Sequence, residues 1–138
     1  MNDRMIAQKT ADYIEKHLDE ELSLDRIAEG LNYSKYYIAR AFAKETGCTV
    51  YKYIQGRRLT KAAKKLVETR EPIIEIAYDA RYNSQQAFNL AFRQLYLCTP
   101  GTYRQNGIFS PKQTRFGREG MRLKAVYSTT MMGGRMAA

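Results

Sequence analysis

The sequence is poor in the residues that build disulfide frameworks and metal sites. Its 138 residues include two cysteines, one histidine and three prolines. Cys48, Cys98 and His17 cannot supply a four-ligand zinc site on their own, and they form no disulfide framework. No apolar run approaches the roughly 18 residues of a membrane span, and the N-terminus lacks a signal-peptide pattern. We therefore expect a cytoplasmic protein without metal, cofactor or membrane anchor.

The charge of the chain is abundant and unevenly distributed. Lys and Arg number 23 against 14 Asp and Glu, a net charge of +9. Residues 1–30 hold four basic and eight acidic residues, whereas residues 31–70 hold ten and two, and residues 108–138 hold six and one. Such an excess favours a polyanionic partner, which is either nucleic acid or an anionic membrane surface. The hydrophobic content of 44% predicts a folded domain, or two small ones that share a core.

An internal repeat organises the chain. When the sequence is shifted by 50 residues, residues 34–55 align with residues 84–105, and identical residues meet at seven positions from Ser34 and Ser84 to Gln55 and Gln105. Just upstream, the Ile-Ala pair at 27–28 meets a second one at a shift of 49. The second copy therefore carries one extra residue before its serine. Two copies of one supersecondary unit explain this pattern.

Each copy predicts two short helices joined by a tight turn. Ser23, Ser34 and Ser84 are suited to cap helices, because a serine oxygen accepts an unpaired amide of the first turn. Asn32 suits the left-handed backbone of the first turn, since asparagine tolerates positive φ. The expected helices of the two units span about 24–30, 35–45, 72–80 and 85–96. Each pair is a helix-turn-helix.

The remaining segments predict helices that cover and connect these units. Apolar residues at helical spacing indicate a leading helix over 4–18 and a long helix over about 50–67, and Thr99-Pro100 begins a last short helix. The expected fold is all-α, with about seven helices. We divide it into a first helix-turn-helix subdomain (1–50), a linker helix (51–68), a second subdomain (69–107) and an irregular basic tail (108–138).

The outward faces of the two capped helices carry side chains suited to reading DNA. A major groove admits one α-helix, where Arg discriminates guanine and Gln or Asn discriminates adenine. The residues of these faces that we expect to contact bases are Tyr36, Arg40, Gln85, Gln86 and Asn89.

Other side chains near these faces are better suited to the DNA backbone. A flexible point charge suffices for a phosphate, which carries no sequence information. We assign phosphate contacts to Lys35, Lys44, Arg57, Lys61, Ser84 and Arg93. Further cations of the linker helix lie mostly opposite its apolar stripe, where some face DNA and others only solvent. Cys48, Cys98 and His17 are expected to be structural.

The motifs resemble those of the AraC/XylS family of bacterial transcription regulators. In the first unit they are Leu-Asp-Arg-Ile-Ala at 24–28, the segment from Ser34 to Phe42, and Lys-Glu-Thr-Gly at 44–47. In the second they are Glu-Pro-Ile at 71–73, Ile-Ala at 76–77, Ser-Gln-Gln at 84–86, Phe-Arg at 92–93 and Thr-Pro at 99–100. The Ser-Gln-Gln motif is similar to that of the small MarA, SoxS and Rob branch. The resemblance spans about residues 4–107.

The resemblance implies how such a chain works. One molecule, acting as a monomer, places two recognition helices in successive major-groove segments of double-stranded promoter DNA and contacts RNA polymerase to activate transcription. The resemblance also implies a base contact at Leu90. Two positions depart from the branch, since Ala39 replaces a polar residue and Leu90 replaces an arginine, so a thymine methyl contact can replace a hydrogen bond and the target sequence should differ. Arg81 stands where the family favours glycine, which implies an unusual backbone angle or a rearranged turn.

Several functions stay open at this point. The 31-residue tail is too short for a small-molecule effector domain, and it is either a basic arm over the DNA or a bystander. The leading interpretation is a sequence-specific activator. The alternative is a DNA- or polymerase-binding protein that represses or competes without activating. An enzyme would need a nucleophile, acid/base pair or metal cluster, and the sequence offers none. A membrane-surface role lacks a long amphipathic anchor.

Overall fold

The computed structural model describes residues 2–117, and this part of the chain is helical, with no strand. Its helices are α1 (Asp3–Lys16), α2 (Leu24–Leu31), α3 (Lys35–Thr46), α4 (Val50–Glu68), α5 (Ile73–Asp79), α6 (Gln85–Tyr96) and α7 (Pro100–Asn106). The all-α prediction with about seven helices is confirmed, and the bounds differ from the expected ones by a few residues. Residues 118–138, most of the expected tail, lie outside the described part.

The predicted serine caps start the helices of both units. The hydroxyl oxygens of Ser23, Ser34 and Ser84 accept hydrogen bonds from the third amide of α2, α3 and α6, at 3.0 to 3.1 Å. Thr49 and Thr99 cap α4 and α7 in the same way, each at 3.1 Å. Each cap satisfies a donor that the first helical turn leaves unpaired. The starts of α2, α3, α4, α6 and α7 are thus fixed by local side-chain signals, whereas α5 follows Pro72 without a side-chain cap.

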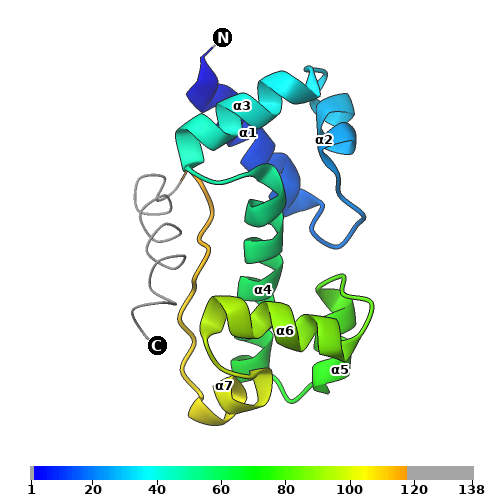
Figure 1. Ribbon diagram of the computed structural model, residues 1–138, viewed down its shortest axis with the longest axis vertical. Helices are drawn as coiled ribbons and strands as arrows, with labels where there is room; N and C mark the ends of the chain where they lie inside the picture. The colour runs from blue at the N-terminus through cyan, green and yellow to red at the C-terminus, as the bar shows by residue number, and fades with distance from the viewer. Residues whose placement is uncertain (1, 118–138) are drawn as a thin grey trace.

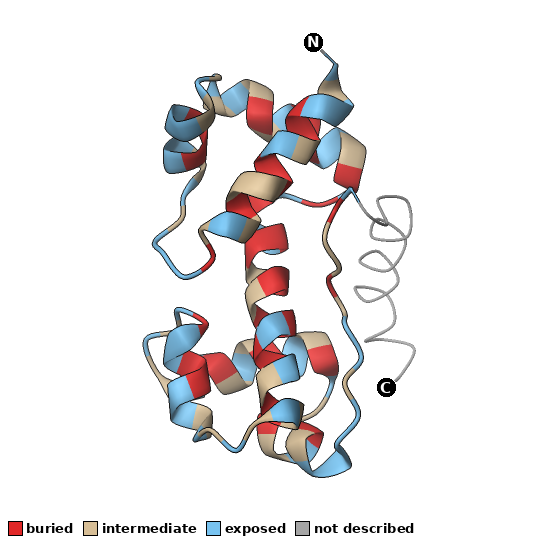
Figure 2. Cartoon of the chain, turned by 180° about the vertical axis from the view of Figure 1, so that it is seen from behind, coloured by how far each residue is buried: buried red, intermediate tan, exposed pale blue. Residues whose placement is uncertain are grey.

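Helix α4 is the axis of the molecule, and each of its ends belongs to a separate core. Its first half contributes Tyr53 and Ile54 to a core that α1, α2 and α3 complete. Its second half contributes Leu66 and neighbouring alanines to a core shared with α5, α6 and α7. Figure 1 shows the two helix-turn-helix units at opposite ends of α4, and buried residues line α4 along its length in Figure 2. One continuous helix therefore sets the distance between the units.

The second helices of the two units have matching orientations. In Figure 1, α3 crosses one end of α4 and α6 crosses the other, and both run from right to left, with α2 and α5 packed at their starts. Both helices bury one face only: Ile38 and Phe42 of α3 and Phe88 and Phe92 of α6 are fully buried. The opposite faces are open to solvent. The repeat in sequence is therefore a repeat in space.

The two turns share a left-handed residue but differ in length. Asn32 has φ 63°, as predicted, and Arg81 has φ 71° at the equivalent place in the second unit. Only one residue, Tyr33, separates Asn32 from its serine cap, whereas Tyr82 and Asn83 separate Arg81 from Ser84. The unusual backbone angle expected at Arg81 is therefore present, and the extra residue follows it.

The start of the tail packs against the helices. Residues 108–117 contain no helix, as expected. They run beside α4 from the second unit to the first (Figures 1 and 2). Gln113 is fully buried and Phe116 is 1% exposed, within the first core. Burial of the Phe116 ring stabilises this packing, because apolar surface is removed from water.

No helix among residues 2–117 is both long and apolar enough to cross a membrane.

Candidate nucleic-acid interface

The outer face of α3 presents an aromatic and cationic surface. Tyr36 is 77% exposed, and Arg40 is also exposed. The guanidinium of Arg40 lies 5.5 Å from the centroid of the Tyr37 ring, a cation–π contact that restrains its position. Lys35 forms an ion pair with Asp25 at 3.1 Å. An exposed pair of this kind is weak, so Lys35 can exchange the carboxylate for a phosphate at little cost.

The outer face of α6 presents amides and one large apolar side chain. Gln86 is exposed, Gln85 is half-buried, and Leu90 is 63% exposed. Arg93 is exposed one turn further along the same helix. Leu90 is thus a large apolar side chain left mostly open to solvent.

Asn89 differs from its neighbours on α6. Its Oδ1 atom is buried and makes no hydrogen bond to any described residue. The side chain as a whole is only half-buried. In this conformation Asn89 does not present its acceptor outward, so it is a weaker candidate for reading adenine than Gln86.

Packing beneath α6 holds its outer face in place. The Phe92 ring stacks on Tyr96 at a centroid distance of 4.7 Å and meets Tyr103 edge-on at 5.4 Å. Phe88 lies between Phe92 and Tyr82, at 5.6 and 5.7 Å. Buried aromatic pairs with these geometries add to the hydrophobic stabilisation. The helix is therefore a rigid support for the amides.

The expected phosphate contacts, with one exception, are accessible. Lys44 is paired with Asp3 at 3.1 Å, and Lys61 lies 3.7 Å from Glu15 with 54% of its side chain exposed. Ser84 caps α6, but its hydroxyl still has a hydrogen to donate. Arg93 is exposed. These groups can reach a polyanion without leaving a buried charge behind.

Arg57 is the exception, and the prediction for it must be corrected. It is 9% exposed, and its guanidinium binds both oxygens of Glu15, at 3.0 and 2.9 Å. A third donor binds the backbone carbonyl of Gln113. A phosphate would have to displace a buried carboxylate. Arg57 therefore joins segments of the protein and is not placed to contact DNA.

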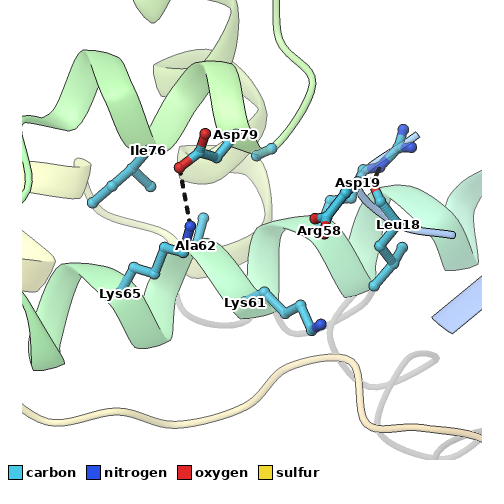
Figure 3. Close-up of a pocket in the computed structure, with 9 residues that line it drawn as sticks. Leu18, Asp19, Arg58, Lys61, Ala62, Lys65, Ile76 and Asp79 are labelled. Atoms are coloured by element: carbon cyan, nitrogen blue, oxygen red, sulfur yellow. Dashed lines mark hydrogen bonds and ion pairs between the residues drawn. The ribbon is translucent and has the colours of Figure 1, made fainter. Parts of the chain in front are cut away.

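A cleft of about 270 Å³ separates the two units on one side of α4. Figure 3 shows its lining: Asp19 and Arg58 at one end, and Lys65 bonded to Asp79 at 3.0 Å at the other. Arg58 donates to the carbonyl oxygens of Leu18 and Glu20, at 3.1 and 2.6 Å. Burial and then the nearby charge of Arg81 lower the pKa of Arg58. The lining thus carries three cations and two carboxylates, and Lys65 and Asp79 pair with each other.

Among residues 2–117 there is no group of three or more side chains that could hold a metal ion. Arg81, for which the sequence predicted only an unusual turn, is exposed before α6. The burial of Gln113 and Phe116 was not predicted. The only sequence signal for the two is weak, namely one aromatic residue near each end of the segment 108–117.

Comparison with known proteins decides the family. Residues 27–106 match the family model described as a helix-turn-helix domain. The Tn10 TetD protein of Escherichia coli is 43% identical over 97 residues, which are 70% of each chain. The regulatory protein SoxS of Salmonella typhimurium is 40% identical over 104 residues, 75% of this chain and 97% of SoxS. The chain belongs to the AraC-type helix-turn-helix family.

Its place in the AraC-type family is the branch of SoxS and Rob, as the Ser-Gln-Gln motif indicated. The transcriptional regulator Rob of Salmonella typhimurium is 42% identical over 98 residues. These residues are 71% of this chain and 34% of Rob, so the chain spans about a third of that relative. The chain is a sequence-specific DNA-binding transcription regulator of this family and not an enzyme.

Solved structures of the AraC-type family share the fold. The C-terminal domain of AraT from Geobacillus stearothermophilus is 33% identical, with a TM-score of 0.70 over 79% of this chain and 91% of that domain. The DNA-binding domain of AdpA, determined in complex with a target DNA, has a TM-score of 0.65. The match covers 73% of this chain and 90% of that domain. Its identity of 23% makes it evidence for the fold alone.

Proposed function

We propose that the protein binds promoter DNA as a monomer and inserts α3 and α6 into successive major-groove segments on one face of the duplex. The observation that carries this proposal is the matched pair of capped helices in one chain, which run in the same direction at the two ends of α4 (Figure 1). Recognition helices of such units enter the major groove by their N-terminal residues. One chain thus supplies both reading elements.

Base contacts are divided between the two helices. Tyr36 and Arg40 of α3 read one half of the site, with Arg40 donating to a guanine. Gln85 and Gln86 of α6 read adenines in the other half, and Leu90 packs on a thymine methyl. Asn89 joins them only if it changes rotamer, since its Oδ1 is buried. Lys35, Lys44, Lys61, Ser84 and Arg93 hold the DNA backbone.

Selection of bound duplexes from a random pool tests this proposal. The expected product is a bipartite motif whose two halves lie about 10 base pairs apart, one turn of the double helix. Analytical ultracentrifugation of the selected complex should give one protein per duplex. A motif with a single half, or two proteins per duplex, would contradict the monomeric bipartite mode.

We further propose that the protein activates transcription by contacting RNA polymerase at the promoters it binds, in the cytoplasm where the chromosome lies. The resemblance to the AraC/XylS family implies this contact with polymerase. A transcription assay with purified polymerase and a promoter that carries the selected motif separates the possibilities. Increased transcript supports activation, whereas a decrease supports the alternative, a protein that occupies DNA or polymerase without activating.

A further inference from the structure

Residues 108–117, here called the strap, connect the two ends of the molecule a second time. Phe109 packs against the second core, and Phe116 is buried in the first. Between them the strap lies beside α4 (Figures 1 and 2). Among the described helices, none of the first unit makes an extensive contact with one of the second. Apart from α4, the strap is thus the main physical link between the units.

The strap is anchored to equivalent residues of the repeat. The backbone amide of Ser110 donates to the hydroxyl of Tyr103 at 2.8 Å, and the amide of Phe116 donates to the hydroxyl of Tyr53 at 3.1 Å. Tyr53 and Tyr103 are exactly one repeat apart, at a shift of 50 residues. Burial raises the pKa of Tyr53 to about 12, so its hydroxyl stays protonated under ordinary conditions. The two units therefore hold the strap by equivalent tyrosine hydroxyls.

The middle of the strap is fixed to α4. The amide of Gln113 donates to the Thr60 hydroxyl at 3.1 Å, and its carbonyl accepts from Arg57. Gln113 lies over Gly56, where a Cβ atom would come within 2.9 Å of Gln113 Cγ and 3.0 Å of its Cβ. A glycine in the middle of α4 costs helix stability of about 1 kcal/mol relative to alanine. Its absent side chain is what allows the strap to lie so close.

We propose that the strap is a specificity-determining tie, which fixes the separation and rotation of α3 relative to α6 and so selects the spacing between the two halves of the DNA site. A single helix such as α4 can bend gently along its length. A second connection attached at both ends and in the middle opposes that bending. This inference rests on the proposed bipartite binding, because spacing matters only if both helices read one duplex.

Two variants release the strap in different ways. Gly56→Ala introduces the clash with Gln113 while improving the helix propensity of α4. Phe116→Ala removes the anchor from the first core. Gly101→Ala is the matched control, because Gly101 lies in α7 and a Cβ there meets nothing within 4 Å. Circular dichroism first checks that each full-length variant is folded.

The first measurement needs no DNA. Residual dipolar couplings of the full chain report whether the two units share one alignment tensor. We expect one tensor for the wild type and Gly101→Ala, and two diverging tensors for Gly56→Ala and Phe116→Ala. If the strap-release variants keep a single common tensor, the strap does not fix the geometry and the proposal is overturned, even if the variants are less stable.

The second measurement uses duplexes with the selected motif and one base pair added or removed between its halves. The wild type and Gly101→Ala should lose about tenfold in affinity on these duplexes, the scale of a lost base contact. Gly56→Ala and Phe116→Ala should bind the altered spacings nearly as well as the original. Identical spacing profiles in all four proteins would overturn the proposal. If the wild type shows no sequence preference, the proposed bipartite binding fails. The residual dipolar couplings then still test whether the strap fixes the geometry of the two units.

Discussion

Arg57 of α4 and Glu15 of α1 form a two-pronged ion pair, 42 residues apart in the sequence. The Nε and Nη2 atoms of Arg57 lie 3.0 and 2.9 Å from the two carboxylate oxygens, and both side chains are nearly buried. The same guanidinium binds the carbonyl of Gln113. One cation thus joins the leading helix, the linker helix and the strap. Arg57, although it is a cation of α4, is therefore not available to contact DNA.

We expect Glu15→Ala to destabilise the protein strongly. The substitution leaves the Arg57 guanidinium buried without its carboxylate, a change that costs roughly 3 kcal/mol. Asp79→Asn is the control, because it breaks the exposed pair with Lys65 and should change the free energy of unfolding by less than about 1 kcal/mol. Urea unfolding of both variants measures the difference. Equal losses in the free energy of unfolding would show that the buried pair stabilises the fold no more than the exposed pair does.

The same pair predicts a dependence of stability on acid. Burial alone would raise the pKa of Glu15, but the hydrogen bond and charge of Arg57, helped by Lys61 and Arg115, outweigh it and bring the pKa below 4.5. The folded state then holds the carboxylate more acidic than the unfolded state does. Its stabilisation is complete above about pH 4.5 and is lost as pH falls through the folded pKa. Between about pH 6 and pH 3, the free energy of unfolding measured in urea should fall less steeply for Glu15→Gln than for the wild type. If both proteins lose stability in parallel over this range, the Glu15 carboxylate is not the cause of the acid dependence.

We expect Arg81→Gly to stabilise the protein. Arg81 adopts φ 71°, and a left-handed residue with a side chain costs about 1 kcal/mol that glycine avoids. The change also removes the positive charge that helps lower the pKa of Arg58. Asn32→Gly is the control, since asparagine already tolerates this region and the gain there should be small. Thermal unfolding of the two variants should rank Arg81→Gly above Asn32→Gly, and the reverse order would refute the strain at Arg81.

Substitutions in the interface should separate base contacts from backbone contacts. Arg40→Ala should weaken binding through one half of the selected motif and relax its sequence preference there, at a cost of about 1 to 3 kcal/mol. Gln86→Ala should do the same at the other half. Lys61→Ala should weaken binding about equally on all sequences and lower the salt slope by about 1. Titrations on single-base variants of the motif over a range of salt test these assignments, and a uniform effect of Arg40→Ala would contradict its role.

Much of the fold was predictable because its signals are local. Ser34 and Ser84 mark helix starts by their own side-chain chemistry, and the repeat at 50 residues doubled the evidence for each element. Asn32 was assigned to a left-handed turn for the same reason. Elements whose geometry is decided by neighbouring residues in the chain were therefore placed within a few residues.

The errors concern side chains decided by distant partners. Arg57 lies on the polar side of the predicted linker helix, and nothing near it in the sequence indicates that Glu15 lies opposite. The strap has no periodicity, and its placement depends on Gly56, which looks like an ordinary weak point in a helix. Asn89 belongs to the outward face by spacing, yet its Oδ1 is buried. Sequence patterns identified the exposed faces but not which of their polar groups the fold itself occupies.

Methylation protection of guanine N7 on the selected duplex tests the two-helix account most directly, because N7 lies in the major groove. On a selected duplex that holds a guanine in each half, the wild-type protein should protect two groups of guanines about 10 base pairs apart, on one face of the DNA, because a helix lying in the groove covers N7 whether or not it bonds to it. Protection of a single group, or of guanines on opposite faces, would show that α3 and α6 do not read the same duplex together.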